Sequence, residues 1–126
     1  MARILIVDDE EMDRLLGRTV LEAAGHEILY AANGEIALRV YESQEIDVVI
    51  TDLAMPNVDG LLLIEQILAV DKRAPIIVVS GVKPGHLERA ADLGAAATIQ
   101  KPYEPEDLLD AVNSALSSAP PGDLPG

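Results

Sequence analysis

Residues 3–11 read RILIVDDEE, an apolar run that ends abruptly in four acidic residues. A short run of branched aliphatic residues is typical of a strand that is buried on both faces, as in a parallel sheet. The acidic residues then lie at the carboxyl end of that strand, which is where open α/β sheets collect their functional groups. This stretch therefore indicates both a fold class and the edge of the sheet at which a functional site is expected.

Four further short apolar runs follow at even intervals, at residues 28–31, 48–50, 76–79 and 95–99. The stretches that follow each run carry apolar residues at helical spacing, and one such predicted buried face contains Ile36, Val40 and Tyr41. Five strands that alternate with five helices predict a (βα)5 chain. Because crossovers between parallel strands are right-handed, we expect an α/β fold with a doubly wound, five-stranded parallel sheet covered by helices on both faces.

Length and composition set limits on the function. A chain of 126 residues fits one domain, and the absence of cysteine excludes disulfides, thiolate metal sites and thiol catalysis. The formal net charge of -13 argues against direct contact with nucleic acid, because carboxylates would face phosphates. The N-terminus is neither a signal peptide nor a membrane span, so we expect a cytoplasmic protein without membrane contact.

The end of the chain differs in composition from the rest. The last ten residues read SSAPPGDLPG, which is too poor in apolar residues to pack. We therefore expect one folded domain over residues 1–117, followed at residues 118–126 by a disordered tail or a truncated linker.

Polar side chains are predicted at the carboxyl ends of four of the five strands: Asp8-Asp9, Asp52, Ser80 and Lys101. Each alone has a simple explanation as a helix cap, a turn residue or a solvated lysine. Three converging carboxylates, however, repel one another unless a cation lies between them, and oxygen ligands without His or Cys favour Mg²⁺. With a lysine and a hydroxyl added, the set contains the groups needed to transfer a phosphoryl group to a carboxylate.

The order and spacing of these residues resemble those of a response regulator receiver domain over residues 2 to about 116. Residues 52–60 read D-x-x-M-P-x-x-D-G, Ser80-Gly81 end the fourth strand, and Lys101-Pro102 end the fifth. The resemblance implies a flavodoxin-like three-layer sandwich with strand order 2-1-3-4-5. It also implies a phosphorylatable signalling module of a two-component system.

The resemblance further implies a role for each site residue. Asp52 would accept a phosphoryl group from a sensor histidine kinase or a phosphotransfer protein, and Ser80 and Lys101 would bind that group. Mg²⁺ would be held by four ligands: Asp8 through water, and Asp9, Asp52 and the backbone carbonyl of Ala54 directly.

The resemblance places the output on the face made by the fourth helix, the fifth strand and the fifth helix. This face would bind an unknown downstream protein, and the chain would be a monomer or a weak dimer through it. The family usually has Tyr or Phe three residues before the lysine, where this chain has Thr98. We expect Tyr103 to pack against the fifth helix, which makes it a poor substitute for that missing aromatic switch residue. The candidate switch residues are Ser80, Gly81, Thr98 and Tyr103. We expect the conformational change on phosphorylation to be carried by the loop after the fourth strand and the start of the fourth helix, at residues 81–88.

The rate of phosphoryl loss and the enzyme class can also be predicted. Neither Ala54 nor Val82 can hold an attacking water with its side chain, so we expect slow self-dephosphorylation and no turnover of an external substrate. One alternative is a receiver-like scaffold that signals without phosphorylation. Another is a phosphatase of the haloacid-dehalogenase type, but that family uses D-x-D, and the residue two after Asp52 is Ala54.

Overall fold

The computed structural model describes residues 2–8, 11–53, 60–72, 74–81, 84–101 and 103–117. Strands and helices alternate along this part of the chain: β1 (Arg3–Val7), α1 (Glu11–Ala23), β2 (Glu27–Ala31), α2 (Gly34–Ser43), β3 (Val48–Thr51), α3 (Gly60–Val70), β4 (Ile76–Ser80), α4 (Pro84–Leu93), β5 (Ala97–Gln100) and α5 (Pro105–Ser117). The tail expected at residues 118–126 lies outside the described residues.

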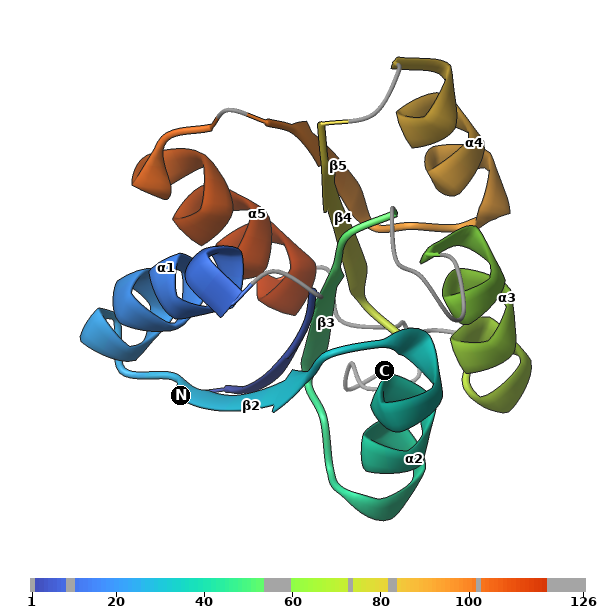
Figure 1. Cartoon of the computed structure of the whole chain (residues 1–126), viewed down its shortest axis with the longest axis horizontal. Coiled ribbons are helices and arrows are strands. Elements are labelled where there is room, and N and C mark those ends of the chain that lie inside the picture. The colour runs from blue at the N-terminus through green and yellow to red at the C-terminus, as the bar shows by residue number, and fades with distance from the viewer. Residues whose placement is uncertain are drawn as a thin grey trace, which may run out of the picture.

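The strands form one parallel sheet in the order β2-β1-β3-β4-β5, which confirms the predicted fold class and strand order. In register, Ile4 of β1 lies opposite Ile28 of β2 on one side and Val48 of β3 on the other. Helices α1 and α5 cover one face of the sheet, and α2, α3 and α4 cover the other (Figure 1). The molecule is therefore a three-layer sandwich whose strands all end at the same edge.

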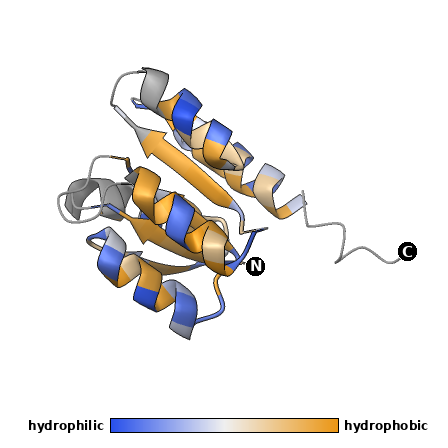
Figure 2. Cartoon of the chain, turned by 90° about the vertical axis from the view of Figure 1, so that its right-hand side faces the viewer, coloured by the Kyte–Doolittle hydropathy of each residue, from blue (hydrophilic) through white to orange (hydrophobic). Residues whose placement is uncertain are grey.

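Each face of the sheet has its own apolar core. Alternate residues of a strand point to opposite faces, so Leu5 and Val7 of β1 join the core under α2, α3 and α4. Ile4 and Ile6 join the core under α1 and α5. The strands in view are mostly apolar, whereas the helices in view combine apolar and polar residues (Figure 2). The central strands β1, β3 and β4 are buried on both faces, as expected in a parallel sheet, whereas the edge strands β2 and β5 each have exposed residues.

Two details differ from the sequence prediction. Strand β5 starts at Ala97 and ends at Gln100, because the small residues before it form a turn after α4. In α2, Ile36 is 42% exposed and Ala37 is fully buried in its place. Ile36 lies in the first turn of the helix, one residue before the face that packs on the sheet. The prediction that its side chain is buried was therefore wrong.

Candidate functional site

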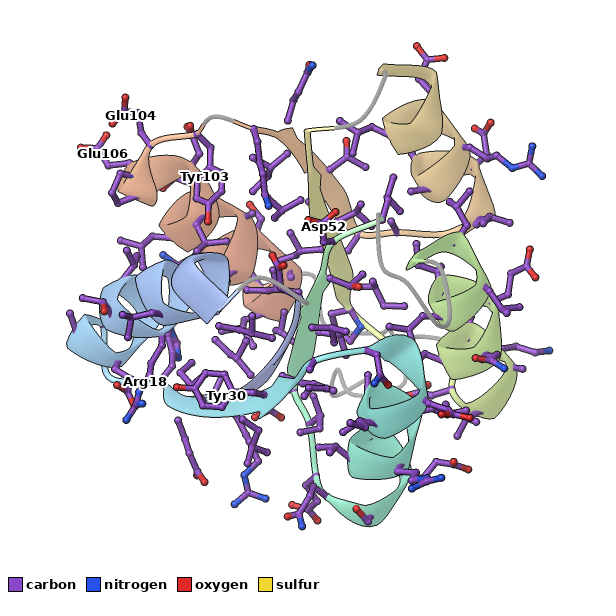
Figure 3. The ribbon with its side chains drawn as sticks, viewed as in Figure 1. Arg18, Tyr30, Asp52, Tyr103, Glu104 and Glu106 are labelled. Atoms are coloured by element: carbon purple, nitrogen blue, oxygen red, sulfur yellow. The ribbon has the colours of Figure 1, made fainter. Side chains whose placement is uncertain are left out.

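Two buried carboxylates lie at the carboxyl edge of neighbouring strands. Asp8 directly follows β1 and Asp52 directly follows β3, and they are only 7% and 8% exposed. The backbone N–H of Asp52 donates to the carbonyl of Val7 at 3.0 Å, and that of Asp8 donates to the carbonyl of Ala31 at 3.1 Å. The sheet hydrogen bonding thus continues one residue past each strand and fixes both carboxylates at one edge, where Figure 3 shows Asp52 at the end of β3.

Lys101 reaches these carboxylates from the end of β5. Its ammonium donates a hydrogen bond to Asp52 Oδ2 at 3.0 Å and lies 3.6 Å from Asp8 Oδ2. The side chain must cross the end of β4 to do so, because β4 separates β3 from β5. One ammonium balances one of the two carboxylates, so these three side chains together keep one negative charge and favour a further cation.

A small cavity of about 20 Å³ lies beneath the charged groups. Its lining combines polar residues from the site with apolar residues from β1, β3, β4, α1 and α5: Ile6, Val7, Asp8, Gly17, Ile50, Thr51, Asp52, Val79, Lys101, Tyr103 and Leu108. A volume of this size accommodates about one water molecule and no larger ligand. The buried Thr51 hydroxyl donates to the carbonyl of Asp52 at 3.0 Å, which holds the backbone of that residue in place.

The structure therefore brings together Asp8, Asp52 and Lys101 of the residues selected from the sequence. Asp9 and Ala54 lie outside the described residues. Ser80 ends β4, the strand between β3 and β5, so its backbone lies at the same edge. Gly81 follows beside Lys101, where an added Cβ would be 3.7 Å from the Cβ of the lysine, an ordinary van der Waals distance.

The two remaining switch candidates lie in different surroundings. Thr98 is exposed on β5 and pairs with Val78 of β4. Tyr103 is partly buried against the core under α1 and α5, and it lines the same cavity as Asp52. The sequence prediction that Tyr103 packs near the fifth helix did not include this link to the acidic site, and neither Thr51 nor the cavity was anticipated.

The donor chemistry of the site fits Mg²⁺. Two buried carboxylates at one edge are hard oxygen ligands, and no His or Cys stands among the residues that line the cavity. In the ranges that the structure describes, no group of three or more potential metal-ligating side chains occurs. The third expected carboxylate, Asp9, lies outside those ranges.

Comparison with known proteins identifies the family. The family model described as the response regulator receiver domain matches residues 4–113. This chain belongs to the response regulator receiver domain family. It is 34% identical to the chemotaxis protein CheY of Thermotoga maritima over 113 residues, which cover 88% of this chain and 94% of that protein.

Solved receiver domains have the same fold. A receiver domain protein from Clostridium thermocellum is 32% identical with a TM-score of 0.88, and the match covers 93% of this chain and 95% of the other. The response regulator protein TrrA from Thermotoga maritima, solved in complex with Mg²⁺-BeF, is 34% identical with a TM-score of 0.85, and the match covers 92% of this chain and 100% of the other.

The function class follows from the family. The chain is a phosphorylatable signalling module of the two-component response regulator type, and the alternative of a scaffold without phosphorylation is not favoured. Receiver domains generally bind Mg²⁺, interact with histidine kinases or phosphotransfer proteins, and are not catalytic enzymes in general. Among the described residues, no helix is both long enough and apolar enough to span a bilayer.

Proposed function

We propose that Asp52 is the phosphoacceptor of this receiver domain. The observation that carries the proposal is the position of Lys101, whose ammonium lies 3.0 Å from Asp52 Oδ2 and 3.6 Å from Asp8 Oδ2. A lysine that reaches across β4 to the carboxylate at the end of β3 is placed to stabilise the negative charge of a phosphoryl group on that carboxylate.

The phosphoryl transfer is a substitution at phosphorus. A carboxylate oxygen of Asp52 attacks the phosphorus of a phosphohistidine, and the phosphorus–nitrogen bond breaks as the new phosphorus–oxygen bond forms. The bonding electron pair stays on the imidazole nitrogen of the donor. The Lys101 ammonium then binds a phosphoryl oxygen, and the hydroxyl of Ser80 donates to another.

The charge of the incoming group requires a cation at this site. A phosphoryl group is doubly negative, and the buried carboxylates of Asp8 and Asp52 repel it. We assign Asp9, Asp52 and the carbonyl of Ala54 as direct ligands of Mg²⁺, with Asp8 acting through water. When bound, Mg²⁺ would supply the positive charge that lets the phosphoryl group approach the carboxylates.

We further propose that the donor is a sensor histidine kinase or a phosphotransfer protein in the cytoplasm. The surface that binds the downstream protein is the face of α4, β5 and α5. The chain is a monomer or a weak dimer through this face. Residues 1–117 form the receiver domain, which catalyses only its own Mg²⁺-dependent phosphorylation and slow dephosphorylation. Helix α5, which ends at Ser117, supports that boundary.

Incubation with acetyl phosphate and Mg²⁺, followed by intact-mass measurement, tests the proposal. We expect one added phosphoryl group, lost in Asp52→Asn and lost when a chelator removes Mg²⁺. Asp47→Asn is the matched control, because Asp47 is an exposed carboxylate at the opposite edge, where it accepts the backbone N–H of Arg3 at 2.8 Å. Undiminished labelling of Asp52→Asn would contradict the assignment.

A further inference from the structure

Thr98 is poorly placed to respond to the acidic site. Its neighbours Ala97 and Ile99 pack into the core under α1 and α5, so alternation along β5 turns Thr98 to the other face of the sheet, where it is exposed. It is not among the described residues that line the cavity beneath Asp52. A signal that reaches α5 therefore needs a different carrier.

Tyr103 connects the acidic site to α5. It follows Lys101 by two residues, lines the same cavity as Lys101 and Asp52, and packs against a core that contains Leu108 and Val112 of α5. Figure 3 shows Tyr103 on the connection from β5 into α5, at the same end of the sheet as Asp52. One aromatic side chain thus contacts both the surroundings of the phosphoacceptor and the helix that follows.

Hydrogen bonds between Glu104 and Asp107 close the turn that directly follows Tyr103 at the start of α5. The backbone N–H of Glu104 donates to Asp107 Oδ2 at 3.0 Å, and the backbone N–H of Asp107 donates to the carbonyl of Glu104 at 2.9 Å. This reciprocal pair makes residues 104–107 a compact first turn. Because a peptide bond joins Tyr103 to Glu104, a displacement of Tyr103 would move this turn with the exposed carboxylates of Glu104 and Glu106, which Figure 3 shows near it at the start of α5.

We propose that Tyr103 transmits the state of Asp52 to α5, as a positioning residue acting through Lys101. The inference rests on the proposed function and names the residue that carries its output. When Asp52 gains a phosphoryl group, the ammonium of Lys101 leaves the carboxylate of Asp8 for the phosphoryl oxygens. The cavity, about one water in volume, lets the ring of Tyr103 shift with the backbone of Lys101 without a clash.

Fluorine NMR of protein labelled with fluorotyrosine tests the inference, because the chain has only three tyrosines. The other two are internal references held away from Asp52. The Tyr30 hydroxyl accepts from Arg18 at 2.8 Å, and the Tyr41 hydroxyl donates to Asp71 at 3.1 Å. Each line is assigned from its Tyr→Phe variant, and beryllofluoride with Mg²⁺ serves as the phosphoryl analogue.

The same spectrum reports binding and response separately. We expect a line from bound beryllofluoride together with a shift of the Tyr103 line by more than its width, while the Tyr30 and Tyr41 lines stay in place. Bound beryllofluoride with an unmoved Tyr103 line would overturn the inference and leave the phosphoacceptor site intact. The absence of bound beryllofluoride would overturn the proposed function, and the inference with it.

Variants then distinguish transmission from packing alone. Tyr103→Leu should still bind beryllofluoride but lose the backbone amide shifts at Leu108 and Val112, whereas Tyr103→Phe, which keeps the ring, and Thr98→Ala should retain them. Shifts in α5 that survive in Tyr103→Leu would contradict the inference. If Tyr103→Leu does not fold, the fluorine shift of Tyr103 in the wild-type protein decides the question.

Discussion

Replacing Lys101 by methionine should destabilise the fold in the absence of Mg²⁺. The substitution keeps most of the side-chain volume and removes the ammonium that lies 3.0 Å from Asp52 and 3.6 Å from Asp8. Two carboxylates less than a tenth exposed then lose a shared cation. The protein should unfold at a lower urea concentration, because the unfolded chain hydrates both carboxylates.

The size of the effect follows from the distances. At an effective dielectric constant of about 20, unit charges at these separations attract by about 5 kcal/mol each before desolvation is counted. Removing one partner of a buried ion pair costs about 3–5 kcal/mol. Because the Lys101 side chain is 25% exposed, we expect a loss of about 2–3 kcal/mol. With a urea m value of about 2 kcal/mol/M, the midpoint should fall by about 1–1.5 M.

The assay is urea unfolding followed by far-ultraviolet circular dichroism, with chelator and with Mg²⁺. Lys72→Met, at an exposed position, is the matched control and should change stability by less than about 0.5 kcal/mol. Adding Asp8→Asn to Lys101→Met should recover part of the loss, and so should Mg²⁺. If Lys101→Met is as stable in chelator as Lys72→Met, the electrostatic account of the site is wrong.

Three further outcomes are expected. Ala54→Asn or Val82→Glu should speed the loss of the phosphoryl group, because each adds a side chain that can hold the attacking water. Equal rates of phosphoryl loss in both variants and the wild type would contradict this explanation. Burial, with the nearby charge of Asp71 and the hydrogen bond to it, raises the pKa of Tyr41 to about 12. The protonated phenol therefore stabilises the fold fully below about pH 10, and this contribution is lost as the pH rises through about 12. Ultraviolet titration should show tyrosine ionisation near pH 12 that is absent in Tyr41→Phe. Asn33→Ala removes the N-cap of α2 and should lower the free energy of unfolding by about 1 kcal/mol, measured in urea.

The main parts of the site could be predicted because they depend on strand ends. Asp8, Asp52 and Lys101 each directly follow a strand, and parallel strands place those ends at one edge whatever the details of packing. The link through Tyr103 could not be predicted in this way. It depends on a cavity formed by β1, β3, β4, α1 and α5 together, and such a volume leaves no local pattern in the sequence.

The buried face of a helix also could not be predicted completely from the sequence. An apolar side chain such as Ile36 marks a buried face on average, yet the sheet contacts Ala37 because the small residue lets α2 approach closely. The ends of two helices have a more local cause. Gly25 and Gly94 adopt φ values of 94° and 120° after α1 and α4, a conformation that favours glycine.

The position of the phosphoryl group is the most direct test of the central claim. Borohydride reduces an aspartyl phosphate to homoserine, so the protein can be phosphorylated with acetyl phosphate and Mg²⁺, reduced, digested and sequenced by mass spectrometry. We predict homoserine at Asp52 alone, and none after omission of Mg²⁺. Homoserine at Asp8 or Asp9 in place of Asp52, or a phosphoryl group that borohydride does not convert, would contradict the account.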